Sequence, residues 1–124
     1  MQTRQREAIR EVLEAADRPL SPQEVLEQAQ GSVPRLGLAT VYRNLNRLLE
    51  EGWLVPVDSV ADSRRFERAG KEHHGHYHCC RCDRVFDLAG CAAQAVVATV
   101  PRGFTVESHE VVVHGRCADC VEVA

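Results

Sequence analysis

The sequence predicts an α+β protein made of two small parts, on three observations. Its first half contains three segments with helical spacing of apolar residues, followed by two short strand patterns. The ten residues 73–82 hold four of the six histidines and three of the six cysteines. Two Cys-x2-Cys pairs, one inside this stretch and one near the last residues, predict that the second part folds around a metal.

Composition and length set the limits of this prediction. The chain has 124 residues, which is enough for one ordinary domain or two small ones. Hydrophobic residues at 44% and charged residues at 27% are typical of a globular protein, and only 5% of residues are aromatic, so the core should be aliphatic. Two such small cores would be marginal without a metal or a partner chain. A net charge of −3 argues against a uniformly basic surface but allows a local positive face.

The expected compartment is the cytoplasm. The opening residues are polar, and the longest apolar run, near 92–100, is too short to span a bilayer, so no membrane partner is expected. Cysteines in that compartment are metal ligands more often than disulfides. A secreted domain with three disulfides is the alternative.

The first half predicts three helices and a hairpin. Helical spacing covers residues 3–16, 22–29 and 38–49, and Ser21-Pro22-Gln23-Glu24 has the residues of a capping box. Gly52 should end the third helix, and strands are expected over 53–58 and 64–68. Three short helices followed by a two-stranded wing form the winged helix-turn-helix plan. We place this domain at residues 1–68 and the second domain at residues 69–124.

The third helix carries the candidate DNA-binding residues. A buried stripe is predicted at Val41, Leu45, Leu48 and Leu49. The residues off this stripe that could contact DNA are Thr40, Tyr42, Arg43 and Asn46. Arginine donates to guanine edges and phosphates, asparagine suits adenine, and a tyrosine ring can contact thymine methyl groups. The alternative is a solvated helix face with an exposed tyrosine.

The second half predicts a zinc site on a small sheet. Strands are expected over 76–80, 84–88 and 104–114, and a helix over 90–100. The four ligands of a structural zinc are predicted to be Cys79, Cys82, Cys117 and Cys120, because two Cys-x2-Cys turns supply a closed tetrahedral shell of thiolates. Cys80 and Cys91 are predicted to be small buried hydrophobes.

The histidines are sorted by strand alternation. His74 and His76 should share one face, where Asp87 and Glu67 could complete the shell of a second divalent metal. His73 should lie on the other face, with His109 as a candidate partner in a further site. His78 and His114 are predicted to be ordinary surface residues.

Three motifs together resemble the ferric uptake regulator (Fur) family of metal-dependent repressors. They are Ala39-Thr40-Val41-Tyr42-Arg43-Asn44-Leu45, then His74-x-His76-x-x-Cys79-x-x-Cys82, and His109 followed by Gly115-x-Cys117-x-x-Cys120. They occur in the family's order and cover nearly the whole chain. Their combination is specific, whereas each one alone is not.

This resemblance implies a function for each part of the chain. Residues 1–68 would be a winged-helix DNA-binding domain with its hinge, and residues 69–124 a metal-binding dimerisation domain. The protein would bind an A·T-rich inverted-repeat operator as a homodimer when a regulatory metal is bound. By position, Glu67, His74, His76 and Asp87 match the regulatory site. His73 and His109 match a further site in which two of the usual ligands are replaced by Gly75 and Gln94.

Several alternatives remain open at the level of sequence. The regulatory metal could be Fe²⁺, Zn²⁺ or Mn²⁺, and the chain could be a peroxide-sensing iron or manganese repressor of the same family. It could also be a zinc-stapled protein-interaction module without a DNA role. An enzyme is not expected, since a zinc hydrolase would need an open metal position and the His-Glu-x-x-His motif is absent.

Overall fold

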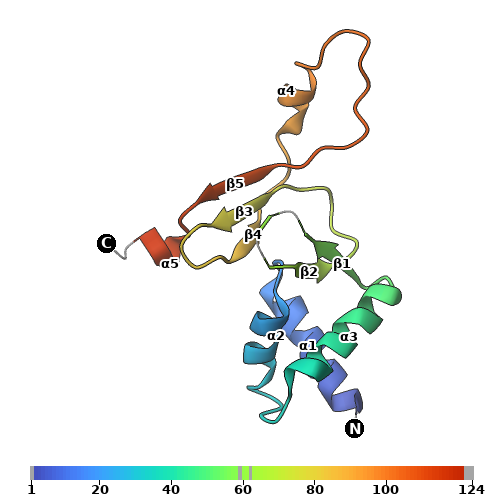
Figure 1. Cartoon of the computed structure of the whole chain (residues 1–124), viewed down its shortest axis with the longest axis vertical. Helices are drawn as coiled ribbons and strands as arrows, with labels where there is room; N and C mark the ends of the chain where they lie inside the picture. The colour runs from blue at the N-terminus through green and yellow to red at the C-terminus, as the bar shows by residue number, and fades with distance from the viewer. Residues whose placement is uncertain (1, 59, 62, 122–124) are drawn as a thin grey trace. The chain divides into compact units, whose positions relative to one another are not determined.

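A computed structural model of the chain describes residues 2–58, 60–61 and 63–121 (Figure 1). The chain divides into two compact units, Met1–Gly70 and Lys71–Ala124. The predicted domain boundary, after residue 68, falls close to this division. None of the described helices combines the length and the apolar character needed to cross a bilayer.

In its described residues, the first unit contains three helices and a two-stranded antiparallel sheet. Its elements are α1 (Gln2–Ala16), α2 (Pro22–Ala29), α3 (Leu38–Glu50), β1 (Leu54–Val57) and β2 (Arg65–Arg68). Leu20, in the α1–α2 connection, forms an isolated antiparallel bridge with Phe66 of β2 and so ties the helices to the hairpin. The predicted winged helix-turn-helix order of elements is confirmed. We call β1 and β2 the wing.

Local hydrogen bonds set the ends of the helices. The Ser21 hydroxyl accepts from the Glu24 backbone N–H at 3.2 Å, and the Glu24 carboxylate accepts from the Ser21 N–H at 2.9 Å. This reciprocal pair is the predicted capping box at the start of α2. After α3, Gly52 adopts φ 78°, and the N–H groups of Gly52 and Trp53 donate to Leu49 and Leu48. That pattern closes a helix with a glycine in the left-handed conformation.

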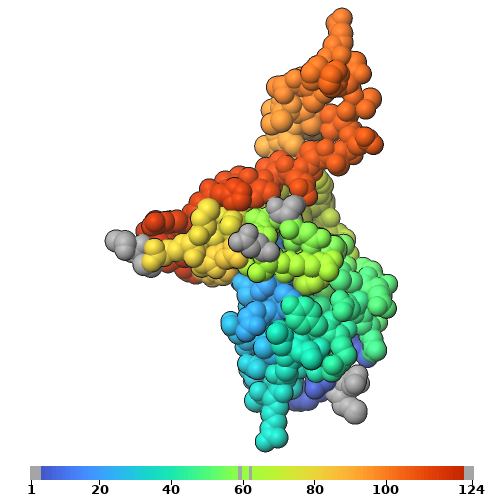
Figure 2. Space-filling view, in the orientation of Figure 1, coloured from blue at the N-terminus to red at the C-terminus, as the bar shows by residue number. Residues whose placement is uncertain are grey.

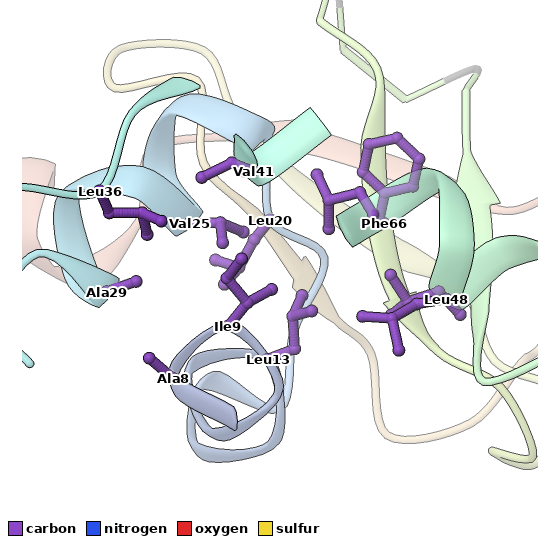
Figure 3. Packing of buried hydrophobic residues seen from close by; sticks show 12 residues of the cluster. Ala8, Ile9, Leu13, Leu20, Val25, Ala29, Leu36, Val41, Leu48 and Phe66 are labelled. Carbon is purple, nitrogen blue, oxygen red and sulfur yellow. The ribbon is translucent and has the colours of Figure 1, made fainter. Parts of the chain in front are cut away.

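The apolar faces of the three helices meet in one core (Figure 3). Leu20 and Phe66 join it from the α1–α2 connection and the wing. The buried residues are Ala8, Ile9, Leu13, Leu20, Val25, Ala29, Leu36, Val41, Leu45, Leu48, Leu54 and Phe66. Three of the four residues of the predicted α3 stripe are fully buried, and the fourth, Leu49, packs against them while partly exposed.

We expect Leu45→Ala to lower the free energy of unfolding of the first unit by about 2–5 kcal/mol, because Leu45 is fully buried and its removal leaves a cavity. Urea unfolding followed by the fluorescence of Trp53 would measure this change. Trp53 is the only tryptophan of the chain and packs against the same core. Leu38→Ala is the control, since Leu38 lies on the same helix but is 38% exposed, and it should cost about 0.5 kcal/mol or less. Equal losses in the two variants would contradict this packing.

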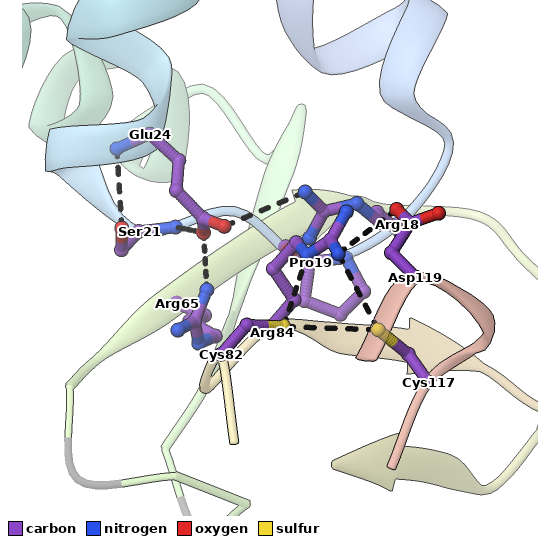
Figure 4. Close-up of polar contacts among 9 residues, drawn as sticks. All are labelled: Arg18, Pro19, Ser21, Glu24, Arg65, Cys82, Arg84, Cys117 and Asp119. Carbon is purple, nitrogen blue, oxygen red and sulfur yellow. Dashed lines mark hydrogen bonds and ion pairs between the residues drawn. The ribbon is translucent and has the colours of Figure 1, made fainter. Parts of the chain in front are cut away.

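A charged contact fixes α2 against the wing (Figure 4). The carboxylate of Glu24 forms an ion pair with Arg65 of β2 and a longer one, 3.4 Å, with Arg18. The Arg65 side chain is buried, so this pairing compensates a charge removed from water. Glu24 therefore serves both the helix cap and the contact with the wing.

As far as the structure describes it, to residue 121, the second unit is a three-stranded sheet with two short helices. Its elements are β3 (His76–Cys79), β4 (Val85–Asp87), α4 (Ala93–Val97), β5 (Val112–Gly115) and α5 (Ala118–Val121). The strand order is β4-β3-β5, with β4 antiparallel and β5 parallel to the central β3. The parallel pairing brings the ends of β3 and β5 to the same edge of the sheet, which is where the two cysteine pairs meet.

Two predicted elements are shorter than expected. Only residues 112–115 of the last strand are paired, and residues 104–111 form no strand, because β3 offers them no further partner. The helix covers 93–97 rather than 90–100. Residues 98–111, which follow α4, extend away from the sheet of this unit (Figures 1 and 2). Large apolar side chains on α4, on this segment and on β5 are exposed, namely Val96, Phe104, Val106 and Val113.

The interior of the second unit is built largely from cysteine. Among its described residues, the buried apolar positions are Cys79, Val85, Ala93, Cys117 and Cys120. Three of these five are members of one cluster, against which Phe86 packs. Burial of so little aliphatic surface contributes only a small hydrophobic free energy. The stability of this unit therefore depends on the interactions that hold the cysteines together.

Candidate metal centres and nucleic-acid interface

Four cysteines gather at one edge of the sheet of the second unit. Cys79 ends β3, Cys82 lies in the β3–β4 turn, Cys117 precedes α5 and Cys120 lies within it. Their sulfur atoms all lie within 4.8 Å of one another. The Sγ atoms of Cys82 and Cys117 are 3.8 Å apart, and a tetrahedron with Zn–S bonds of about 2.3 Å has edges of about 3.8 Å. The donor set fits a structural zinc ion, and we call these residues the zinc cluster.

Hydrogen bonds to the zinc cluster favour thiolates. The backbone N–H groups of Cys82 and Cys117 donate to Cys79 Sγ at 3.4 and 3.3 Å. Arg84 donates from Nε to Cys82 Sγ at 3.1 Å and from a terminal nitrogen to Cys117 Sγ at 3.3 Å (Figure 4). The same terminal nitrogen donates to Asp119 at 3.0 Å. The guanidinium therefore offsets part of the negative charge that several thiolates would bring together.

Hydrogen bonding and burial shift the thiol pKa values in opposite directions. The hydrogen bond from the Cys82 N–H lowers the pKa of Cys79 to about 5. Burial raises the pKa of Cys120 to about 12. Burial alone would also raise the pKa of Cys82, but hydrogen bonds from Arg84 lower it overall. The cluster thus presents a thiolate at neutral pH, and a cation would displace the remaining protons on binding.

Two histidines and a carboxylate form a second cluster on the β3–β4 hairpin. His76 opens β3 and is the cross-strand partner of Asp87. The Nε2 atoms of His74 and His76 lie 3.1 and 3.6 Å from Asp87 Oδ1. The two imidazole rings stand edge to face, with centroids 4.8 Å apart. His74 and His76 therefore share one side of the hairpin, as strand alternation predicted.

The orientation of His74 prepares it to bind a cation. Its Nδ1 lies 2.7 Å from the backbone carbonyl oxygen of Glu72, which can only accept, so Nδ1 carries the proton. In the neutral ring Nε2 then presents a lone pair toward the carboxylate of Asp87, which is also an acceptor. A divalent cation between these atoms could bind to both, and imidazole with carboxylate suits Zn²⁺, Fe²⁺ or Mn²⁺. The residues fit a divalent metal.

Two further charged residues, Lys71 and Glu67, bear on the proposed metal site. The ammonium group of Lys71 lies 2.6 Å from the second oxygen of Asp87, so it holds the carboxylate in place and competes with a cation for its charge. Glu67, the other predicted ligand, lies on β2 of the first unit and is only 5% exposed. A carboxylate so deeply buried is uncommon unless it is paired or binds a metal.

A third cluster contains His73 and His109. Their Nε2 atoms are 2.8 Å apart, and Cys91 Sγ lies 3.6 Å from that of His109. The prediction of Cys91 as a small buried hydrophobe is wrong, because its side chain is half-buried and faces an imidazole. A side chain at Gly75 would meet the carbonyl oxygen of Val111 at 2.9 Å, so this position has no room for a larger, metal-binding residue.

His78, Cys80 and His114 form a fourth cluster that the sequence did not predict. Cys80 is exposed rather than buried, so its prediction as a buried hydrophobe is wrong. His114 is an exposed surface residue as predicted, but His78 is half-buried and its Nδ1 lies 3.0 Å from Nδ1 of His114. One ligand atom from each of the three residues lies within 4.8 Å of the others.

The α3 helix presents the candidate DNA-contacting residues to solvent. Tyr42, Arg43 and Asn46 are exposed and Thr40 is half-buried. Arg43 donates to the Thr40 hydroxyl at 3.0 Å, which positions the guanidinium along the helix. Residues 38–49 include two arginines and no carboxylate, so this face is locally positive although the whole chain is acidic. Such a face fits the phosphate backbone and the base edges of DNA.

The comparison with protein families decides the relationship. The model of the ferric uptake regulator family matches residues 1–114 of this chain. The chain belongs to the ferric uptake regulator family. Members of the Fur family regulate transcription in response to metal, so metal-dependent regulation of transcription is the function class of this chain.

Individual relatives and structures support the same Fur-family assignment. The zinc uptake regulation protein of Mycobacterium tuberculosis is 31% identical over 120 residues, which cover 95% of this chain and 92% of that protein. The structure of the Helicobacter pylori ferric uptake regulator, described as having three functional metal binding sites, has a TM-score of 0.72 and 28% identity, covering 95% of this chain and 80% of that one. A zinc uptake regulator complexed with zinc and DNA has a TM-score of 0.54 and 29% identity, covering 96% and 82%. Zinc and iron regulators both occur among these matches, so membership of the Fur family does not decide the metal.

Sequence reasoning missed two positively charged side chains next to the candidate metal-binding clusters of this Fur-family chain. Arg84 contacts two sulfur atoms of the zinc cluster, and an arginine two residues beyond a Cys-x2-Cys pair is a signal that could have suggested it. Lys71 reaches Asp87 from sixteen residues away, and no local pattern marks such a contact. Arg84 places positive charge beside the cysteine sulfur atoms, and Lys71 places it beside the carboxylate of Asp87.

Proposed function

We propose that this chain is a metal-responsive repressor that binds an A·T-rich inverted-repeat operator in the cytoplasm as a homodimer. The observation that carries the proposal is the cluster of His74, His76 and Asp87, whose imidazole lone pair and carboxylate face one another. A winged-helix unit in the same chain supplies a surface for DNA. The cluster supplies the sensor that the function of the family requires.

The DNA-binding part of the proposal rests on the exposed face of α3. In winged helix-turn-helix proteins the second helix of the motif enters the major groove, where arginine and asparagine read base edges. Tyr42 and Asn46, with residues of α2 and β2, line a groove of ≈ 280 Å³ beside this helix. The relative solved with zinc and DNA is consistent with this use of the fold.

The sensing part of the proposal assigns four ligands to one regulatory site. His74, His76 and Asp87 would hold the cation in the second unit, and Glu67 would bind it from the first unit. Ligands from both units would make metal affinity depend on the arrangement of the units, which is the requirement for coupling. A divalent cation bound there would supply positive charge to both carboxylates. The ligand set suits Fe²⁺, Zn²⁺ or Mn²⁺.

The homodimer is proposed from the exposed apolar residues of the second unit. Phe104 is 69% exposed and Val96 is 67% exposed, and residues 104–111 have backbone groups outside the paired sheet. Exposed apolar side chains beside unpaired extended backbone are typical of a surface that a second chain covers. A second copy of this chain would also match the two-fold symmetry of an inverted-repeat operator.

The test of the proposed function is a metal titration of DNA binding. The protein would keep its zinc cluster filled, and fluorescence anisotropy would follow binding to an A·T-rich inverted-repeat duplex at fixed salt. Zn²⁺, Mn²⁺ and, under anaerobic conditions, Fe²⁺ would be added in turn. One metal should raise DNA affinity at low free concentration and so identify the sensed ion. DNA affinity that no metal alters would contradict the regulatory assignment.

Replacement of Arg43 by alanine separates a DNA-binding protein from a zinc-stapled interaction module. We expect a loss of about 1–3 kcal/mol for each copy of the chain, which for a dimer lowers operator affinity by at least about 30-fold. Arg81→Ala removes the same charge from an exposed position of the second unit and should leave affinity nearly unchanged. Equal DNA binding by wild type and the Arg43 variant, with both folded by circular dichroism, would favour the interaction module.

A further inference from the structure

We propose that His78, Cys80 and His114 bind a further divalent metal ion of borderline softness, represented by Zn²⁺, on the β3 and β5 strands of the second unit. None of these residues belongs to the zinc cluster, to the regulatory site or to the cluster of His73 and His109. The three ligands are therefore available for a separate ion.

The sheet itself brings the three side chains together. In the parallel pairing of β3 and β5, His78 and His114 are direct cross-strand partners, so their side chains leave the same face. Cys80 follows His78 by two positions, and its backbone N–H donates to Gly115 at 2.7 Å, which ties it to the end of β5. Cys79 lies between them and points into the zinc cluster. The adjacent residues Cys79 and Cys80 thus belong to two different clusters.

Asp83 orients His78 for metal binding. Its carboxylate lies 2.6 Å from Nε2 of His78 and can only accept, so Nε2 carries the proton and Nδ1 presents a lone pair. That lone pair faces Nδ1 of His114 at 3.0 Å. A carboxylate that accepts from the remote nitrogen of an imidazole is the usual second partner of a metal-bound histidine.

The position of Asp83 is set by the turn around the zinc cluster. Its backbone adopts φ 65°, a left-handed conformation that a non-glycine residue rarely takes, and its N–H donates to the Cys79 carbonyl at 2.9 Å. In this conformation, which Asp takes more readily than most non-glycine residues, the carboxylate lies against His78.

The donor set indicates the class of ion. Two imidazole nitrogens and one thiolate suit Zn²⁺ and its borderline neighbours rather than hard ions such as Mg²⁺ or Ca²⁺. Three protein ligands leave one tetrahedral position for water. Cys80 and His114 are exposed, so an ion can enter from solvent without a change of fold. The zinc cluster, in contrast, is an all-sulfur site with no open position.

Residue-resolved alkylation tests this site. The full-length protein, with its zinc cluster filled, would be treated with iodoacetamide with and without added Zn²⁺, and tandem mass spectrometry would follow Cys80 and Cys91 separately. Zn²⁺ should slow alkylation of Cys80 by at least about ten-fold, because a metal-bound thiolate is a poor nucleophile. Cys79 and Cys82 should stay unreactive throughout, which shows that the zinc cluster and the fold persist.

Two histidine variants act as reciprocal controls. His114→Ala should abolish the protection of Cys80 and leave the alkylation rate of Cys91 at its wild-type value, whereas His109→Ala should leave Cys80 protected. If His114→Ala exposes Cys79, His114→Gln replaces it as the test variant. Zn²⁺ that leaves Cys80 equally reactive in the wild type, or protects it equally without the imidazole, would overturn the proposal.

Discussion

Replacement of Cys79 by serine should unfold the second unit and leave the first unit folded. Three of the five buried apolar residues described in this unit are cysteines of the zinc cluster, so little other apolar burial is available. Structural zinc contributes an apparent free energy of about 10–16 kcal/mol in zinc-finger peptides. This is comparable to or larger than the whole net stability of an ordinary domain, about 5–15 kcal/mol. Loss of one thiolate should therefore remove the unit's main source of stability.

The two units can be followed separately in this experiment. Trp53 belongs to the first unit, so its fluorescence should keep the wild-type emission and unfolding midpoint in the Cys79 variant. Amide resonances of residues 76–79 and 112–115 should lose their dispersion. Elemental analysis should show about one zinc ion fewer per chain than in the wild type.

Cys80→Ser is the matched control for this variant. Cys80 is the next residue in the chain but is exposed and lies outside the zinc cluster, so its replacement should keep the fold. A Cys79 variant that lacks zinc and still shows a dispersed second unit would contradict the central role of the metal. The same outcome would require another source of stability, such as the proposed contact with a second copy.

Structure that depends on neighbouring residues was predictable from the sequence. The three helices follow from apolar spacing, and the capping box at Ser21 and the left-handed Gly52 follow from residue type at helix ends. The zinc cluster follows in the same way, because each Cys-x2-Cys pair is a local turn and zinc needs two of them. These features need no knowledge of distant contacts.

Structure that depends on the register between distant strands was not predictable. Residues 104–111 have the composition of a strand, but a strand needs a partner, and β3 pairs only with residues 112–115. The meeting of His78 with His114 likewise requires the parallel register of β3 and β5, which no sequence pattern reveals. Cys80 was predicted to be buried because an isolated cysteine is most often buried. Its place beside His78 and His114 depends on the same strand register.

We expect His76→Ala to abolish the dependence of operator binding on metal. His76 is the cross-strand partner of Asp87, and its ring contacts that of His74, so its loss would open the proposed regulatory site at its centre. Coupling of about 1–3 kcal/mol corresponds to a rise of about 5- to 150-fold in DNA affinity when metal binds. In the variant this ratio should fall to about one, while affinity without metal stays at the wild-type value, because α3 is untouched.

Metal binding and DNA binding must be measured on the same variant to interpret this result. Calorimetry should show that His76→Ala weakens one metal site, and anisotropy should show that the metal response is lost with it. His114→Ala removes an imidazole from the neighbouring strand without altering the regulatory site, so it should keep the wild-type ratio. A His76 variant that loses this metal site but still responds to metal would place the sensor elsewhere. Since His73 and His109 also face one another at 2.8 Å, that pair would then become the sensor to test.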